Sequence, residues 1–82
     1  MDKSKYLSQI LFNLGKRIKL IRKIKDITQT QLAENCEMEK STISKIEAGL
    51  VNVGYITLYR ISIGLGVSIC ELTRDKKPKS NS

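Results

Sequence analysis

Apolar residues recur at helical spacing in the N-terminal part of the chain. They stand three or four positions apart, with most lysines and arginines on the other faces; the stripe consists of Leu7, Leu11, Leu14, Ile18 and Ile21. This spacing predicts a long amphipathic helix, with residues 1–13 as an N-terminal extension that continues into it. Further apolar positions widen the stripe, namely Ile10, Phe12, Leu20 and Ile24. A second apolar side of this kind favours burial against a partner subunit.

Four shorter helices are expected after the first. Thr28 with Gln31 three residues later has the spacing of a capping box, and the same pattern recurs at Ser68. Gly49 and Gly66 stand where glycine commonly ends a helix. Together with the apolar spacing, these signals predict helices over residues 29–36, 39–48, 56–65 and 68–73. We therefore expect an all-α fold of five helices.

A chain of 82 residues is long enough for one small domain. At this length roughly 60–65% of the unfolded surface becomes buried, which leaves little room for a second domain or an elaborate active-site cavity. We assign the domain to residues 14–73. Residues 74–82 are basic and contain the proline, so we expect a disordered tail there.

The chain is strongly basic, with 15 Lys and Arg against eight Asp and Glu and a net charge of +7. Such an excess favours an anionic partner, either nucleic acid or an acidic membrane surface, although it also occurs in proteins that are merely soluble. Location of the charge must decide between these interpretations.

Other composition features narrow the classes of function. Cys36 and Cys70 lack metal-ligand spacing and the chain has no histidine, so we expect no metal and no cofactor. An enzyme is nearly excluded, because there is also no nucleophile motif and no phosphate-cradling glycine loop. The sequence shows no leader and no apolar run of membrane length, which favours a cytoplasmic protein with reduced thiols and no membrane partner.

Residues 29–48 have the organisation of a helix-turn-helix motif, two short helices joined by a brief turn. Ala33 is small enough to let another helix approach closely, and Ile43 and Ile46 point inward from the second helix. The outward face of that helix carries short hydroxyls and lysines and consists of Lys40, Ser41, Ser44 and Lys45. On an isolated helix this would usually be a solvated face. In this motif it suits a major groove about 12 Å wide, which admits a helix of similar diameter.

Three segments carry a resemblance to a known family: TQTQLA from Thr28, STISKIE from Ser41 and ISIGLGVS from Ile61. Together with Gly49, they resemble the Cro/C1-type helix-turn-helix repressors, also called the Xre family, over about residues 14–72. The resemblance implies a compact five-helix, lambda-repressor-like domain that binds double-stranded DNA and regulates transcription.

The resemblance also implies roles for single residues. Thr28 and Gln29 fall where family members meet the DNA backbone. Asn52 matches an asparagine that, in many relatives, helps anchor the loop after the recognition helix against a phosphate. The recognition helix would contribute Lys40, Ser41, Thr42, Ser44 and Lys45 to DNA binding. Arg22 and Glu47 fall where the family has a structural ion pair, and the inward position of Glu47 independently calls for a cation, since an unpaired buried charge is costly.

Two glutamates depart from the family pattern. Many relatives have glycine at the position of Glu37, and a left-handed backbone there would cost a glutamate about 1–2 kcal/mol. Relatives commonly begin the recognition helix with Ser, Thr or Asp, whereas Glu39 is a poorer N-cap, although its charge suits the helix dipole.

A single recognition helix contacts too few base pairs to select a site in a genome, so we expect a homodimer on a near-palindromic operator with half-sites about 34 Å apart. The candidate interface residues are Leu50, Val51, Val53, Tyr55, Ile63 and Ile69. We expect no small-molecule ligand domain. Within the family this favours a restriction-modification controller or a phage-type repressor, and of these two subtypes we prefer the controller. The alternative is an antitoxin-like or adaptor domain whose main partner is another protein.

Overall fold

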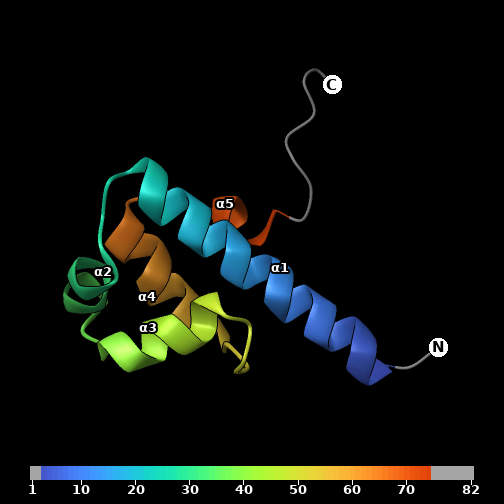
Figure 1. The fold of residues 1–82 in the computed structure, drawn as a ribbon. Coiled ribbons are helices and arrows are strands. Elements are labelled where there is room, and N and C mark those ends of the chain that lie inside the picture. The colour runs from blue at the N-terminus through green and yellow to red at the C-terminus, as the bar shows by residue number, and fades with distance from the viewer. Residues whose placement is uncertain (1–2, 75–82) are drawn as a thin grey trace, which may run out of the picture.

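The computed structural model describes residues 3–74, and this part of the chain forms five helices and no strand (Figure 1). The helices are α1 (Lys3–Ile24), α2 (Gln29–Cys36), α3 (Lys40–Glu47), α4 (Tyr55–Leu65) and α5 (Ile69–Thr73). The predicted all-α, five-helix fold is confirmed. Apart from Arg74, the predicted tail lies outside the described residues.

The helix boundaries follow from local signals. At the start of α2, the Thr28 hydroxyl accepts a hydrogen bond from Gln31 N at 3.0 Å, and the Gln31 side chain accepts one from Thr28 N at 2.9 Å. This is the predicted capping box, which satisfies two backbone donors that the helix itself leaves free. Ser68 caps α5 in the same way but its box is only half formed, because the Glu71 carboxylate pairs with Arg17 instead.

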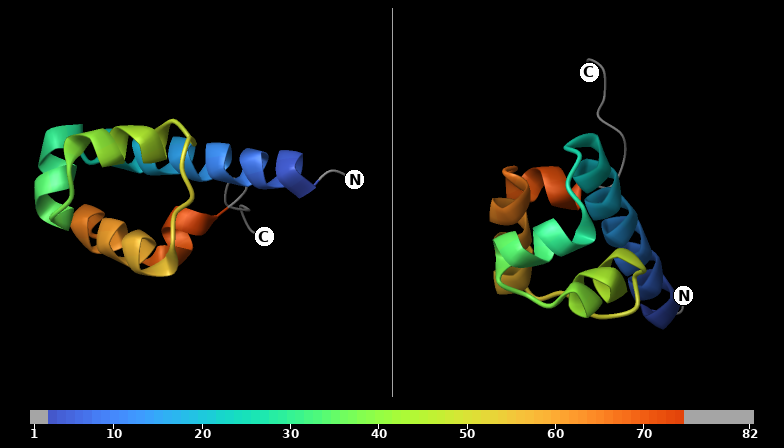
Figure 2. Two further views of the ribbon diagram at one scale, coloured as in Figure 1. Left: turned by 90° about the horizontal axis from the view of Figure 1, so that it is seen from below. Right: turned by 60° about the vertical axis from the view of Figure 1, so that its left-hand side comes forward.

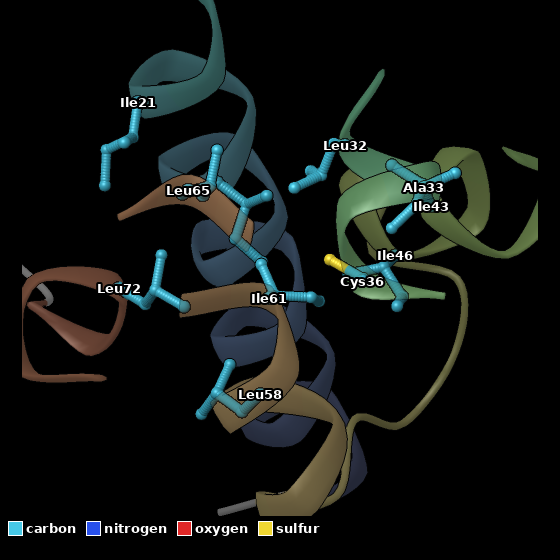
Figure 3. Packing of buried hydrophobic residues seen from close by; sticks show 11 residues of the cluster. Ile21, Leu32, Ala33, Cys36, Ile43, Ile46, Leu58, Ile61, Leu65 and Leu72 are labelled. Atoms are coloured by element: carbon cyan, nitrogen blue, oxygen red, sulfur yellow. The ribbon is translucent and has the colours of Figure 1, made fainter. Parts of the chain in front are cut away.

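The helices enclose one core (Figures 2 and 3). α1 packs against α3 and α5, α2 packs against α3 and α4, and α4 packs against α5. The buried apolar residues are Ile18, Ile21, Leu32, Ala33, Cys36, Ile43, Ile46, Leu58, Ile61, Leu65 and Leu72. Cys36 is a core residue, and burial raises the pKa of its thiol, against the opposing effect of the charge on Arg60.

The contact between α1 and α3 depends on Gly15. A Cβ atom at this position would lie only 2.5 Å from the carbonyl oxygens of Ile46 and Glu47. The two helix backbones therefore meet with no side chain between them, and this contact places the C-terminal end of α3. A glycine inside a strongly periodic helix is the one sequence signal that would have predicted such a close approach.

The N-terminal half of α1 projects beyond the body of the molecule (Figures 1 and 2). Of the apolar stripe predicted for this helix, Ile18 and Ile21 are buried and Leu14 packs at the edge of the core, but Leu7 is 56% exposed. Leu7 therefore belongs to the predicted apolar stripe but lies outside the core of this chain. The helix runs past the elements that would cover it.

Candidate nucleic-acid interface

α2, the turn after it and α3 form a helix-turn-helix whose turn has a left-handed residue. Glu37 has φ 59° and ψ 47°, and the hydrogen bonds from Met38 N to Ala33 O at 2.9 Å and from Glu37 N to Glu34 O at 3.2 Å form a Schellman motif. The family turn is thus made without the glycine that suits it, because Glu37 adopts the conformation that glycine adopts more readily.

Replacing Glu37 with glycine should raise the free energy of unfolding by about 1 kcal/mol, since it removes the left-handed penalty. The measurement is urea denaturation, in which the midpoint should rise with an unchanged slope. Glu37→Ala is the matched control, because it removes the same charge and exposed side chain but keeps the Cβ atom. Equal midpoints for the two variants would show that charge, not backbone strain, governs this position.

α3 has an inward and an outward side. Ile43, Ile46 and Glu47 are buried against the body, whereas the predicted contact residues Lys40, Ser41, Ser44 and Lys45 are all exposed. Thr42 is half-buried. The start of α3 has no side-chain cap, since Glu39 makes no capping hydrogen bond. Among the residues of α3, those on the exposed side thus provide two hydroxyl groups and two ammonium groups but no carboxylate.

The carboxylate of α3 is occupied in the interior. Arg22 Nε donates to Glu47 Oε2 at 2.6 Å and Arg22 Nη2 donates to Glu47 Oε1 at 3.0 Å, and both residues are only 7% exposed. The ion pair that the resemblance implied is present. Arg22 also donates from Nη1 to Ile27 O at 2.9 Å, so one guanidinium joins α1, the loop before α2, and α3. Its bidentate geometry fixes the orientation of α3 as well as neutralising Glu47.

Gln29 takes part in the same network. Its side-chain nitrogen donates to Glu47 Oε1 at 3.0 Å, and the residue is half-buried. The family resemblance placed Gln29 at the DNA backbone and did not predict this bond. Gln29 therefore connects the start of α2 to α3 through its side-chain amide.

An open hollow lies where α1 ends and where α2 and α3 begin. Its volume is about 550 Å³ and its lining residues are Arg22, Lys23, Asp26, Ile27, Thr28, Gln29, Thr30 and Lys40. The first N–H groups of α2 and the positive end of its dipole lie at this hollow, which suits an anion such as a phosphate. Lys23 and Lys40 add positive charge from two other helices, and Asp26 opposes them.

The structure brings some predicted site residues together and leaves one apart. Thr28, Gln29 and Lys40 line the hollow, next to the outward face of α3. Asn52 is exposed in the loop between α3 and α4, which contributes no residue to the hollow. Lys23, which the sequence did not single out as a contact residue, lines the hollow because α1 ends there in a tight turn with Asp26 at φ 60°, which apolar spacing does not predict.

Residues 3–74 offer no sign of two other kinds of site. These residues contain no group of three or more His, Cys, Asp or Glu that could hold a metal ion. Over the same range, every helix is too short or too polar to span a bilayer.

Comparisons with known proteins agree with the helix-turn-helix arrangement of α2 and α3. The family model described as "Helix-turn-helix" matches residues 18–72. The control protein C.MunI of a Mycoplasma species is 34% identical over 70 residues, covering 84% of this chain and 95% of that protein. The immunity repressor protein of Bacillus phage phi105 is 33% identical over 63 residues, covering 77% of this chain and 44% of the repressor.

Solved structures with the same fold include two bacterial regulators. The restriction-modification controller protein C.AhdI from Aeromonas hydrophila superposes with a TM-score of 0.74 at 26% identity, covering 76% of this chain and 94% of C.AhdI. The clp gene regulator ClgR from C. glutamicum superposes with a TM-score of 0.78 at 24% identity, covering 80% and 85%. With its motif, buried ion pair and family match, this chain belongs to the Cro/C1-type helix-turn-helix family of DNA-binding transcriptional regulators.

Proposed function

We propose that the chain is a restriction-modification controller-type regulator that binds a near-palindromic operator as a homodimer, with α3 of each copy in a major groove. The observation that carries this proposal is the distribution of charge on α3. Its one acid, Glu47, is buried against Arg22, while its exposed side presents Lys40, Ser41, Ser44 and Lys45. A helix of this kind meets a polyanion without a repelling carboxylate.

The proposed DNA contacts divide by their position around α3. Ser41, Ser44 and Lys45 lie on the exposed face of the helix and read base edges, with Thr42 at its margin. Thr28, Gln29, Lys23 and Lys40 surround the hollow at the start of α2 and hold a backbone phosphate. Asn52 reaches a second phosphate from the loop after α3.

The controller subtype is supported by C.MunI, a control protein whose length this chain nearly spans, and by C.AhdI, a restriction-modification controller. We propose that the regulator acts in the cytoplasm. We propose no cofactor and no small-molecule effector, so that regulation depends on protein concentration and on the spacing of operator sites.

The proposal predicts strong salt dependence and a symmetric sequence preference. Selection from random duplex DNA should recover a near-palindrome with half-sites one helical turn apart. Binding to the recovered site should weaken roughly a thousandfold between 50 and 200 mM salt, because about six phosphate contacts of the dimer release counterions. Fluorescence anisotropy at several salt concentrations measures this slope. No enriched motif, or affinity that is indifferent to salt, would contradict the proposal.

Dimer formation is supported by apolar residues that the chain leaves uncovered. Of the interface residues predicted from sequence, Leu50, Tyr55 and Ile63 are more than half exposed. The other three, Val51, Val53 and Ile69, pack at the edge of the core and are less available than expected. Ile56 and Tyr59 are also exposed on α4.

A further inference from the structure

The charged residues of this chain are unevenly distributed. Residues 6–15 contain no Asp, Glu, Lys or Arg, and between Leu50 and Cys70 the one charged residue is Arg60. This is unusual for a chain of which 28% is charged and which carries a net charge of +7. In a soluble helical protein, uncharged stretches of this length are expected in the interior.

Residues 3–12, here called the arm, are not in the interior. The arm is the part of α1 that projects beyond the body in Figure 2. Four of its five large apolar side chains are 41–60% exposed, namely Tyr6, Leu7, Ile10 and Phe12, and the fifth, Leu11, is half-buried. At 100° per residue, Tyr6, Ile10 and Leu7 lie within an arc of about 100° around the helix axis, and Phe12 lies more than about 100° away from each of them. An apolar stripe of this width on a helix is normally packed against another element, and the described chain does not bury this one.

The fold brings the two uncharged stretches together. A Cβ atom on Gly49, at the end of α3, would lie 2.8 Å from Cα of Phe12, so the loop that begins with Leu50 starts beside the arm. On another side, Ile10 lines a small cleft with Leu72, Thr73 and Arg74 at the end of α5. The arm therefore adjoins the start of the α3–α4 loop, where Leu50 is exposed, and the end of α5.

The size of this combined surface matters for dimer formation. The loop and α4 expose five large apolar residues, Leu50, Tyr55, Ile56, Tyr59 and Ile63. A stable interface of standard size uses about 20–30 residues a side, which this patch alone does not approach. The arm adds four more large apolar residues and the polar residues between them.

We propose that the arm packs against a second copy of the chain, so that the arm and the exposed face of the α3–α4 loop and α4 form one dimer interface. This inference rests on the proposed function, which requires a dimer. A second copy is favoured over an acidic partner because residues 6–12 of the arm are uncharged and Arg60 is the one charged residue of the α3–α4 loop and α4. With Lys3 and Lys5 confined to the first turn of the arm, two chains of charge +7 meet there with few opposing like charges, whereas an acidic partner would select the lysine-bearing faces. DNA is disfavoured as the occupant for the same reason.

The test compares two double variants of the full chain. Tyr6→Ser with Leu7→Ser truncates the arm, and Leu20→Ser with Ile24→Ser is the matched control. The control side chains belong to the same helix and are 51% and 72% exposed, but they lie in its charged half. The sequence also placed Leu20 and Ile24 on the side expected to face a partner subunit, whereas the interface proposed here leaves them out, so the control tests this distinction. Sedimentation equilibrium gives the dimer dissociation constant, and circular dichroism gives the helix content. We expect the arm variant to raise this constant about 10- to 100-fold, as truncation of interface anchors does, and the control to change it less than about threefold.

DNA binding separates failure of this inference from failure of the proposed function. On a duplex with one half-site of the selected operator, both variants should bind like the wild type, while the arm variant should lose affinity for the full palindrome. If the wild type selects no operator, the proposed function fails, whatever the variants do. If the wild type binds its operator but the arm variant dimerises as well as the control does, the inference is overturned and something other than a second copy covers the arm.

Equal weakening in both variants would also overturn the inference, because it would show a general effect of α1 composition. Should the double arm variant lose helix content, Tyr6→Ser alone provides the comparison, because Tyr6 is 60% exposed. For that variant a rise of about threefold or more in the dissociation constant is expected, and an unchanged constant would overturn the inference.

Discussion

Replacing Glu47 with alanine should lower the free energy of unfolding by about 3–5 kcal/mol, because it leaves the Arg22 guanidinium buried without its counterion. The cost is that of an uncompensated buried charge, and the side-chain nitrogen of Gln29 loses its acceptor as well. Urea denaturation followed by circular dichroism measures the change.

Glu71→Ala is the comparison for this prediction. Glu71 also pairs with an arginine, Arg17 at 3.0 Å, but its side chain is 40% exposed, so the decrease should be at most about 1 kcal/mol. A double variant, Arg22→Met with Glu47→Leu, should recover much of the stability that Glu47→Ala removes, since it eliminates both buried charges. If Glu47→Ala were no more harmful than Glu71→Ala, the pair would not be what fixes α3 to the body.

Replacing Lys45 with alanine should weaken operator binding by about 1–3 kcal/mol for each half-site and relax the preference at one base position. Lys45 is exposed on α3 and lies where the helix would face base edges, so its removal should affect DNA recognition without affecting folding. Anisotropy titrations against the operator and its single-base-pair variants measure both effects.

Lys23→Ala is the matched charge removal for that experiment. Lys23 lines the hollow at the start of α2, where we propose a phosphate. Its removal should weaken binding about equally on all sequences. It should also make the dependence of log affinity on log salt shallower, by about one unit for each phosphate that the variant no longer neutralises. If Lys45→Ala instead behaved like Lys23→Ala, α3 would be turned about its axis relative to the proposed orientation.

Features that depend on neighbouring residues were predictable from sequence. The capping box at Thr28 and the apolar spacing around it place α2 correctly to the residue, because both act within a few positions along the chain. For α3 the expected ends, Glu39 and Ala48, are its caps, so the error is one residue at each end. The inward position of Glu47 predicted a cation beside it, and the family resemblance implied that this cation is Arg22, as the structure shows.

Features that depend on distant parts of the chain were decided by the tertiary structure. The bond from Arg17 Nε to Glu71 O at 2.9 Å, which helps join α1 to α5, and the sharing of Glu47 between Arg22 and Gln29 both follow from how the helices cross. The hollow needs three helix ends to meet at one place. The periodicity of α1 shows which residues are apolar but not where the rest of the body ends. Helical periodicity and caps thus determined the elements and the outward side of α3, while the packing of α1 over Gly15 decided which part of that helix joins the core and which part projects as the arm.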